Sequence, residues 1–178
     1  MMNWISRVLV GISVWSVAAA SMAQDLEGAD TNSGPLRDAT YQVVWLIESD
    51  DENRPAYEGQ ARDGLTEIGF GRLVVAGSVL AGTTIGTPST VAGESRYGAM
   101  QINMQMLNTT RKGEVQVKLK IETKSPAPLQ LSTTARVPMG TWAILGASNS
   151  RVGVPKAAID GKRGVVIVRV HEGIVTLD

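Results

Sequence analysis

The chain has 178 residues, no cysteine, and 17 basic against 17 acidic side chains, so its formal net charge is zero. The lack of cysteine excludes disulfides and thiolate metal sites. Charges of both signs are scattered along the sequence, which argues against nucleic acid as a partner, because phosphate binding needs a concentrated basic surface. Aromatic residues make up only 4%, while Val, Ile, Leu, Thr and Gly are plentiful. This composition favours β-structure.

The first 23 residues have the three-part pattern of a secretory signal peptide. Arg7 is the only charged side chain there, an uncharged apolar run follows from Val8 to Ala20, and small residues precede a cleavage position after Ala23. The apolar run has about 13 residues, whereas a membrane-spanning helix needs about 20. We therefore expect residues 1–23 to be removed on export and not to remain as an anchor.

Residues 24–39 are polar and acidic and contain Gly and Pro, so we expect a flexible linker before a folded domain that spans residues 40–178. The run Tyr41–Ile47 is almost wholly apolar, which predicts a strand covered on both faces. Asp50–Pro55 predicts a solvated turn, since its three carboxylates lack the spacing of a calcium loop. Residues 56–68 are the only helical candidate, short and weakened by two glycines.

Glycine-punctuated strands are expected from Phe70 to Val91. A strict period-two alternation follows in residues 100–106 and resumes in residues 114–122 after a polar turn. Because side chains alternate across a strand, each segment has one apolar and one polar face. The short, Gly-containing turn between the two segments predicts an antiparallel hairpin. The apolar face would consist of Met100, Ile102, Met104, Met106, Val115, Val117, Leu119 and Ile121.

The remaining sequence predicts further strands. They cover residues 129–137, residues 141–146 after a tight turn, residues 165–170 and the short segment 173–177. The β-branched run at 165–170 suits a central position in a sheet. The expected fold is therefore a single, mainly β, antiparallel domain with one short helix.

Three methionines offer the sharpest candidate chemistry. Met100, Met104 and Met106 could bind a soft ion such as Cu(I) through their thioethers. The sequence favours the other interpretation, that they are ordinary apolar core, because Ile102 shares their face and methionine packs adaptably. The only histidine, His171, has no partner that the sequence places beside it. We therefore predict no catalytic or cofactor-binding residues and no enzyme activity.

Three stretches resemble the carboxy-terminal homology domain of bacterial outer-membrane secretins. Residues 65–75 are similar to the short helix and first strand of that domain, Gly98–Glu122 to its alternating hairpin, and Pro138–Gly146 to its closing strand. Only a linker precedes Tyr41, where full secretins carry ring-building domains. The resemblance therefore implies a secretin-like sheet in a small envelope protein, an accessory or cut-down relative of the secretion-system channels.

We thus expect a non-enzymatic exported protein, in the periplasm or outer membrane, that acts by protein–protein or outer-membrane association. Its expected partners are envelope proteins or further copies of itself, and it needs no cofactor. The alternative is a soluble periplasmic β-sandwich that binds a small ligand or a soft metal such as Cu(I).

Overall fold

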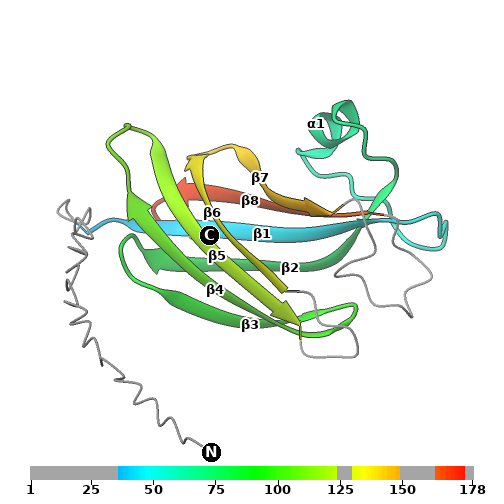
Figure 1. Ribbon diagram of the computed structural model, residues 1–178, viewed down its shortest axis with the longest axis horizontal. Helices are drawn as coiled ribbons and strands as arrows, with labels where there is room; N and C mark the ends of the chain where they lie inside the picture. Colours follow the sequence, from blue (N-terminus) through cyan, green and yellow to red (C-terminus); the bar gives the residue numbers. More distant parts are fainter. Residues whose placement is uncertain (1–35, 124–129, 149–162, 175–178) are drawn as a thin grey trace, which may run out of the picture.

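The protein folds into one antiparallel eight-stranded sheet that curls until its ends nearly meet (Figure 1). The computed structural model describes residues 36–123, 130–148 and 163–174, so the expected signal peptide and most of the expected linker lie outside the described residues. The elements are β1 (Asp38–Glu48), α1 (Arg62–Glu67), β2 (Leu73–Thr84), β3 (Ser89–Ser95), β4 (Gly98–Asn108), β5 (Glu114–Thr123), β6 (Gln130–Pro138), β7 (Trp142–Ser148) and β8 (Gly164–Glu172). The mainly β prediction is confirmed.

The strand order is β6-β5-β4-β3-β2-β1-β8-β7. Strands β1 to β6 therefore follow one another as a meander, and β8 returns to pair with β1. The two end strands, β6 and β7, are joined by a tight turn in which Gly140 has φ 83°. The backbone N–H of Gly140 donates to the carbonyl of Val170 at 2.7 Å. That bond ties the turn to β8 and brings the two ends of the sheet together.

The predicted hairpin is present as β4 and β5. Ile102 lies opposite Ile121 and Met104 opposite Leu119, and burial alternates along both strands with the predicted period of two. Gly113 provides the left-handed residue of the turn, at φ 81°, a conformation that glycine adopts without steric cost.

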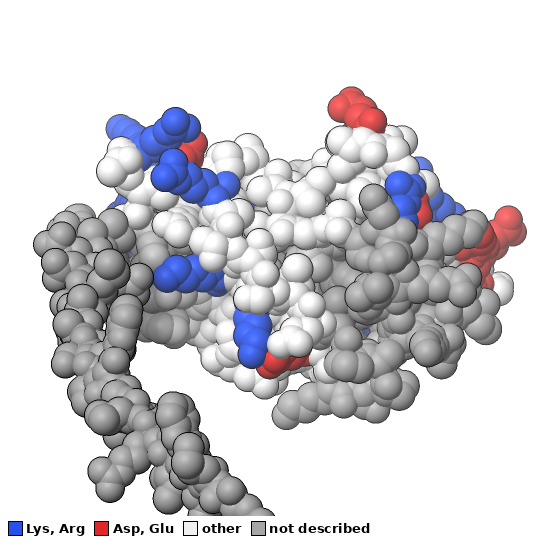
Figure 2. Space-filling model, viewed as in Figure 1, with Lys and Arg blue, Asp and Glu red and all other residues white. Residues whose placement is uncertain are grey.

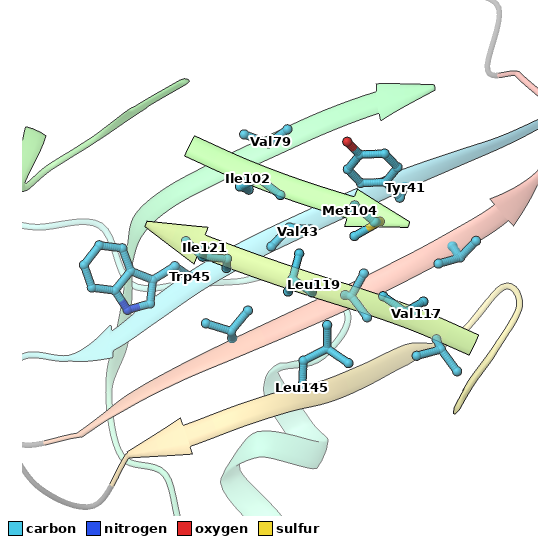
Figure 3. Close-up of a cluster of buried hydrophobic side chains, with 14 of the residues drawn as sticks. Tyr41, Val43, Trp45, Val79, Ile102, Met104, Val117, Leu119, Ile121 and Leu145 are labelled. Atoms are coloured by element: carbon cyan, nitrogen blue, oxygen red, sulfur yellow. The ribbon is translucent and has the colours of Figure 1, made fainter. Parts of the chain in front are cut away.

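The hydrophobic core fills the inside of the curled sheet. In Figure 3, β4 and β5 cross in front of β1, and Leu119 and Ile121 belong to the same core cluster as Val43 and Trp45. The rings of Trp45 and Tyr97 are tilted against each other, with centroids 5.4 Å apart. Since apolar burial is the main stabilising term in folding, this interior is what holds the two halves of the sheet together.

A smaller apolar layer lies on the outer face of β1 and β8. Val44 and Leu46 point outward there and pack with Leu65 of α1 and with Phe70. Leu65 and Phe70 thus cover Val44 and Leu46 of β1 from outside, while the core covers the strand from inside. This confirms the prediction of a strand buried on both faces, and β8 is likewise central, between β1 and β7.

Three predicted boundaries differ from the structure. Strand β1 begins at Asp38, inside the segment expected to be linker, because Asp38 pairs with Thr84 and Ala39 is fully buried. Helix α1 covers only six residues of the predicted 56–68, since the N–H of Tyr57 donates instead to the carbonyl of Leu73 at 2.7 Å. Strand β8 ends at Glu172, so the last predicted strand does not start at Gly173; residues 175–178 lie outside the described residues.

Candidate functional site

A shallow groove of about 330 Å³ runs across strands β3 to β6. The polar side chains of β4, β5 and β6 lie next to one another in this groove, because the pairing register of the strands aligns them in rows. Asn103 lies opposite Lys120, which lies opposite Ser132 on β6. The next row across the same strands consists of Gln105, Lys118 and Thr134. The groove therefore presents amides, ammonium groups and hydroxyls side by side.

Hydrogen bonds order part of this groove. The hydroxyl of Thr90 on β3 donates to Oδ1 of Asn103 at 2.7 Å, and Nζ of Lys120 forms an ion pair with Glu122 at 2.8 Å. Such surface ion pairs are worth little individually, so Lys120 remains available to exchange partners. The groove can accept a ligand or protein surface that supplies carboxylates and hydrogen-bond acceptors.

Charge is unevenly divided between this part of the molecule and the rest. Among the described residues from 98 to 138, five side chains are basic and two are acidic, a net charge of +3. The other described residues carry seven basic and ten acidic side chains, a net charge of −3. Basic groups gather at the β4–β5 turn, at the upper left of Figure 2, and acidic groups at α1 and the right-hand end. Although the whole chain has no net charge, these two parts of the molecule therefore carry opposite net charges.

A second cavity, of about 360 Å³, lies beside α1 and is lined by Tyr57, Arg62, Phe70 and Arg72 among others. The guanidinium of Arg72 donates to the carbonyls of Ser49 and Asp51 at 3.1 and 2.8 Å and so holds the loop that follows β1. Burial raises the pKa of the Tyr57 hydroxyl, an effect partly offset by a hydrogen bond with the backbone of Ala61.

Next to this cavity, a buried carboxylate fixes the end of β1. Glu48 is 8% exposed and accepts hydrogen bonds from Arg163 at 2.7 and 2.5 Å and from the N–H of Gly71 at 2.7 Å. The hydrogen bond to Glu48 raises the pKa of Arg163, whose guanidinium lies 4.8 Å from the centre of the Phe70 ring. Charge-assisted hydrogen bonds of this kind are stronger than those between neutral groups. Here they connect the end of β1 with the residues that precede β2 and β8.

The three candidate metal ligands lie in the core. Met100, Met104 and Met106 face the interior with exposures of 2%, 2% and 0%, alongside Ile102. All three belong to the main cluster of buried apolar residues. Within the described residues, no group of three or more His, Asp or Glu side chains could hold a metal ion. His171 is half-buried on β8, opposite Thr40 of β1.

The residues of the groove were visible in the sequence as the polar half of the alternation, but only the pairing register shows that Lys118, Lys120, Ser132 and Thr134 form one surface. In the part of the chain that the structure covers, no helix is both long and apolar enough to span a membrane. No protein-family model matches the chain, and no curated protein sequence matches it significantly.

Proposed function

We propose that the chain is a non-enzymatic, exported protein of the cell envelope with a secretin-like β-domain, acting by association with other envelope proteins. The observation that carries the proposal is the outer surface of β4, β5 and β6. The apolar side chains of these strands point into the core, and the polar side chains line an open groove on the outside. A surface of amides, hydroxyls and lysines suits a polar, hydrated protein interface.

The polarity of this surface also favours a partner in water over a hydrocarbon phase. Polar groups moved out of water without hydrogen-bond partners cost several kcal/mol each in an apolar medium, on the order of 4–8. The outward residues of β5 and β6 include Lys118, Lys120, Ser132, Thr134 and Arg136. Where outer-membrane association occurs, we therefore expect it to act through proteins or headgroups at the membrane surface.

Export and association are tested in one experiment on the native protein. We expect the purified protein from the envelope fraction to begin at Gln24, and a photo-crosslinker at Thr134 to give adducts with envelope proteins. The matched control places the same crosslinker at Ser78, an exposed position on the outer face of β2. A protein that stays in the cytoplasm with residues 1–23 attached contradicts export, and equal adducts from Thr134 and Ser78 contradict association through the groove.

The cavity beside α1 supports a second candidate, the binding of a small ligand. Tyr57, Phe70 and Arg62 line it together, a combination suited to an aromatic carboxylate that would replace Glu58 as the ion-pair partner of Arg62. A panel of aromatic carboxylates should then raise the melting temperature of the wild-type protein but not of Arg62→Gln. Failure of the whole panel to shift the wild type would remove this candidate. The buried methionines give no comparable support to a Cu(I) site.

A further inference from the structure

Helix α1 carries two exposed carboxylates, and an exposed apolar residue follows it directly. The helix projects from the sheet (Figure 1), and Ile68, directly after it, is 57% exposed. Asp63 and Glu67 are both exposed, and their spacing of four residues places them on one side of the helix. An isolated exposed apolar residue needs no explanation by itself. Its position in the acidic part of a molecule with a basic groove elsewhere is the informative feature.

The groove on β3 to β6 is complementary to this projection. It is concave where α1 projects, and it carries Lys118 and Lys120 where α1 carries Asp63 and Glu67. The one basic residue of α1, Arg62, forms an ion pair with Glu58. The described residues 98–138 have a net charge of +3 and the other described residues −3. Figure 2 shows the largest group of basic side chains at the upper left and acidic side chains on the right, where basic ones also lie beside them. Because the two surfaces lie on different elements, one copy can present its α1 while another presents its groove.

We infer that the partner of the groove is a second copy of this chain, which inserts the end of α1, with Ile68 as its apolar anchor, between the lysines of β5. This inference rests on the proposed function, since it names the occupant of the same association surface. The contact is heterologous, joining different surfaces of the two copies, so each association leaves one groove and one α1 open for the next copy. Opposite charges on the two surfaces also accelerate the encounter and make it sensitive to salt.

Sedimentation of the chain from residue 24 onward tests the inference. We expect species above the monomer mass at low salt, and a return to monomer as salt is raised. Ile68→Ser, Glu67→Lys and Lys118→Glu should each weaken association by about tenfold or more, as expected for a central contact. The matched controls are Leu80→Ser, an exposed apolar residue on β2 with 64% exposure, and Arg96→Glu in the turn before β4. Both controls should associate as the wild type does.

A charge-exchange experiment makes the assignment specific. Glu67→Lys and Lys118→Glu should each associate poorly alone, whereas a chain that carries both changes should recover association, because in every contact the new lysine on α1 faces the new carboxylate in the groove. A wild type that is monomeric at all salt concentrations, equal effects of Ile68→Ser and Leu80→Ser, or a double variant that stays monomeric would each overturn the inference. If Thr134 still crosslinks to other envelope proteins in those cases, the proposed function stands and only the identity of the partner is wrong.

Discussion

The side chain of Leu131 on β6 lies directly over Gly146 on β7, with its Cδ1 2.9 Å from the place that a Cβ atom at residue 146 would occupy. These strands are the two ends of the strand order. The pairing of β7 with β8 shifts register between Ile144 and Gly146. The two end strands, β6 and β7, come together here without pairing, and we call this line the seam of the curled sheet. The contact between Leu131 and Gly146 covers the interior at this seam.

Gly146→Ala should lower the free energy of unfolding by about 1–3 kcal/mol, the usual cost of overpacking a core, as measured by urea denaturation. The new methyl group would occupy the space that Leu131 fills. In a Leu131→Ala background the same substitution should cost less, because the clash is gone, so the two changes should not be additive. Strictly additive losses would show that the seam is not closed by this pair.

Gly64→Ala should stabilise the protein by about 0.5–1 kcal/mol, since alanine restricts the unfolded chain and favours helix. Gly64 lies within α1, and an added Cβ would have no atom within 4 Å. Gly69→Ala is the contrasting control and should destabilise, because Gly69 has φ 90°. Thermal denaturation should therefore show a higher melting temperature for Gly64→Ala and a lower one for Gly69→Ala than for the wild type. A loss of stability in Gly64→Ala would mean that α1 is not helical at this residue.

Met104→Ala should cost about 2–5 kcal/mol of unfolding free energy, because it leaves a cavity in a packed core. Met104→Leu keeps the volume and should cost less than about 1.5 kcal/mol. The neighbouring Gln105→Ala, on the polar face of the same strand, removes only a hydrogen bond of 3.4 Å to the carbonyl of Gly86 and should cost about 1 kcal/mol or less. Equal stability of Met104→Ala and Gln105→Ala would contradict the inward position of the methionines.

Tyr57 should ionise at a higher pH than a free tyrosine, whose pKa is about 10, because burial raises the pKa of its hydroxyl. The raised pKa stabilises the folded state fully below the unfolded-state pKa, and this contribution is lost as the pH rises through the folded-state value. The difference in phenolate absorbance between the wild type and Tyr57→Phe isolates this titration. A midpoint at or below 10 would contradict the partial burial of Tyr57.

Several elements could be predicted because their residues carry local signals. The alternation from Met100 to Ile121 predicted two strands, their inner face and the turn between them. Residues 138–140 predicted the turn between β6 and β7. The start of β1 could not be predicted in this way. Asp38 and Ala39 have no strong strand preference, and they become ordered only because Thr84 and Glu172, far along the chain, pair with them.

The sequence by itself determined that the protein is a mainly β domain and which face of each alternating strand avoids water. It did so because the period of apolar residues depends only on neighbouring positions in the chain. Only the tertiary structure decided that the ends of the curled sheet come together at Leu131 and Gly146, that Glu48 meets Arg163, and that Lys118, Lys120 and Thr134 form one groove. These relationships join residues distant in sequence, and they follow from strand register and sheet curvature, which local patterns do not encode.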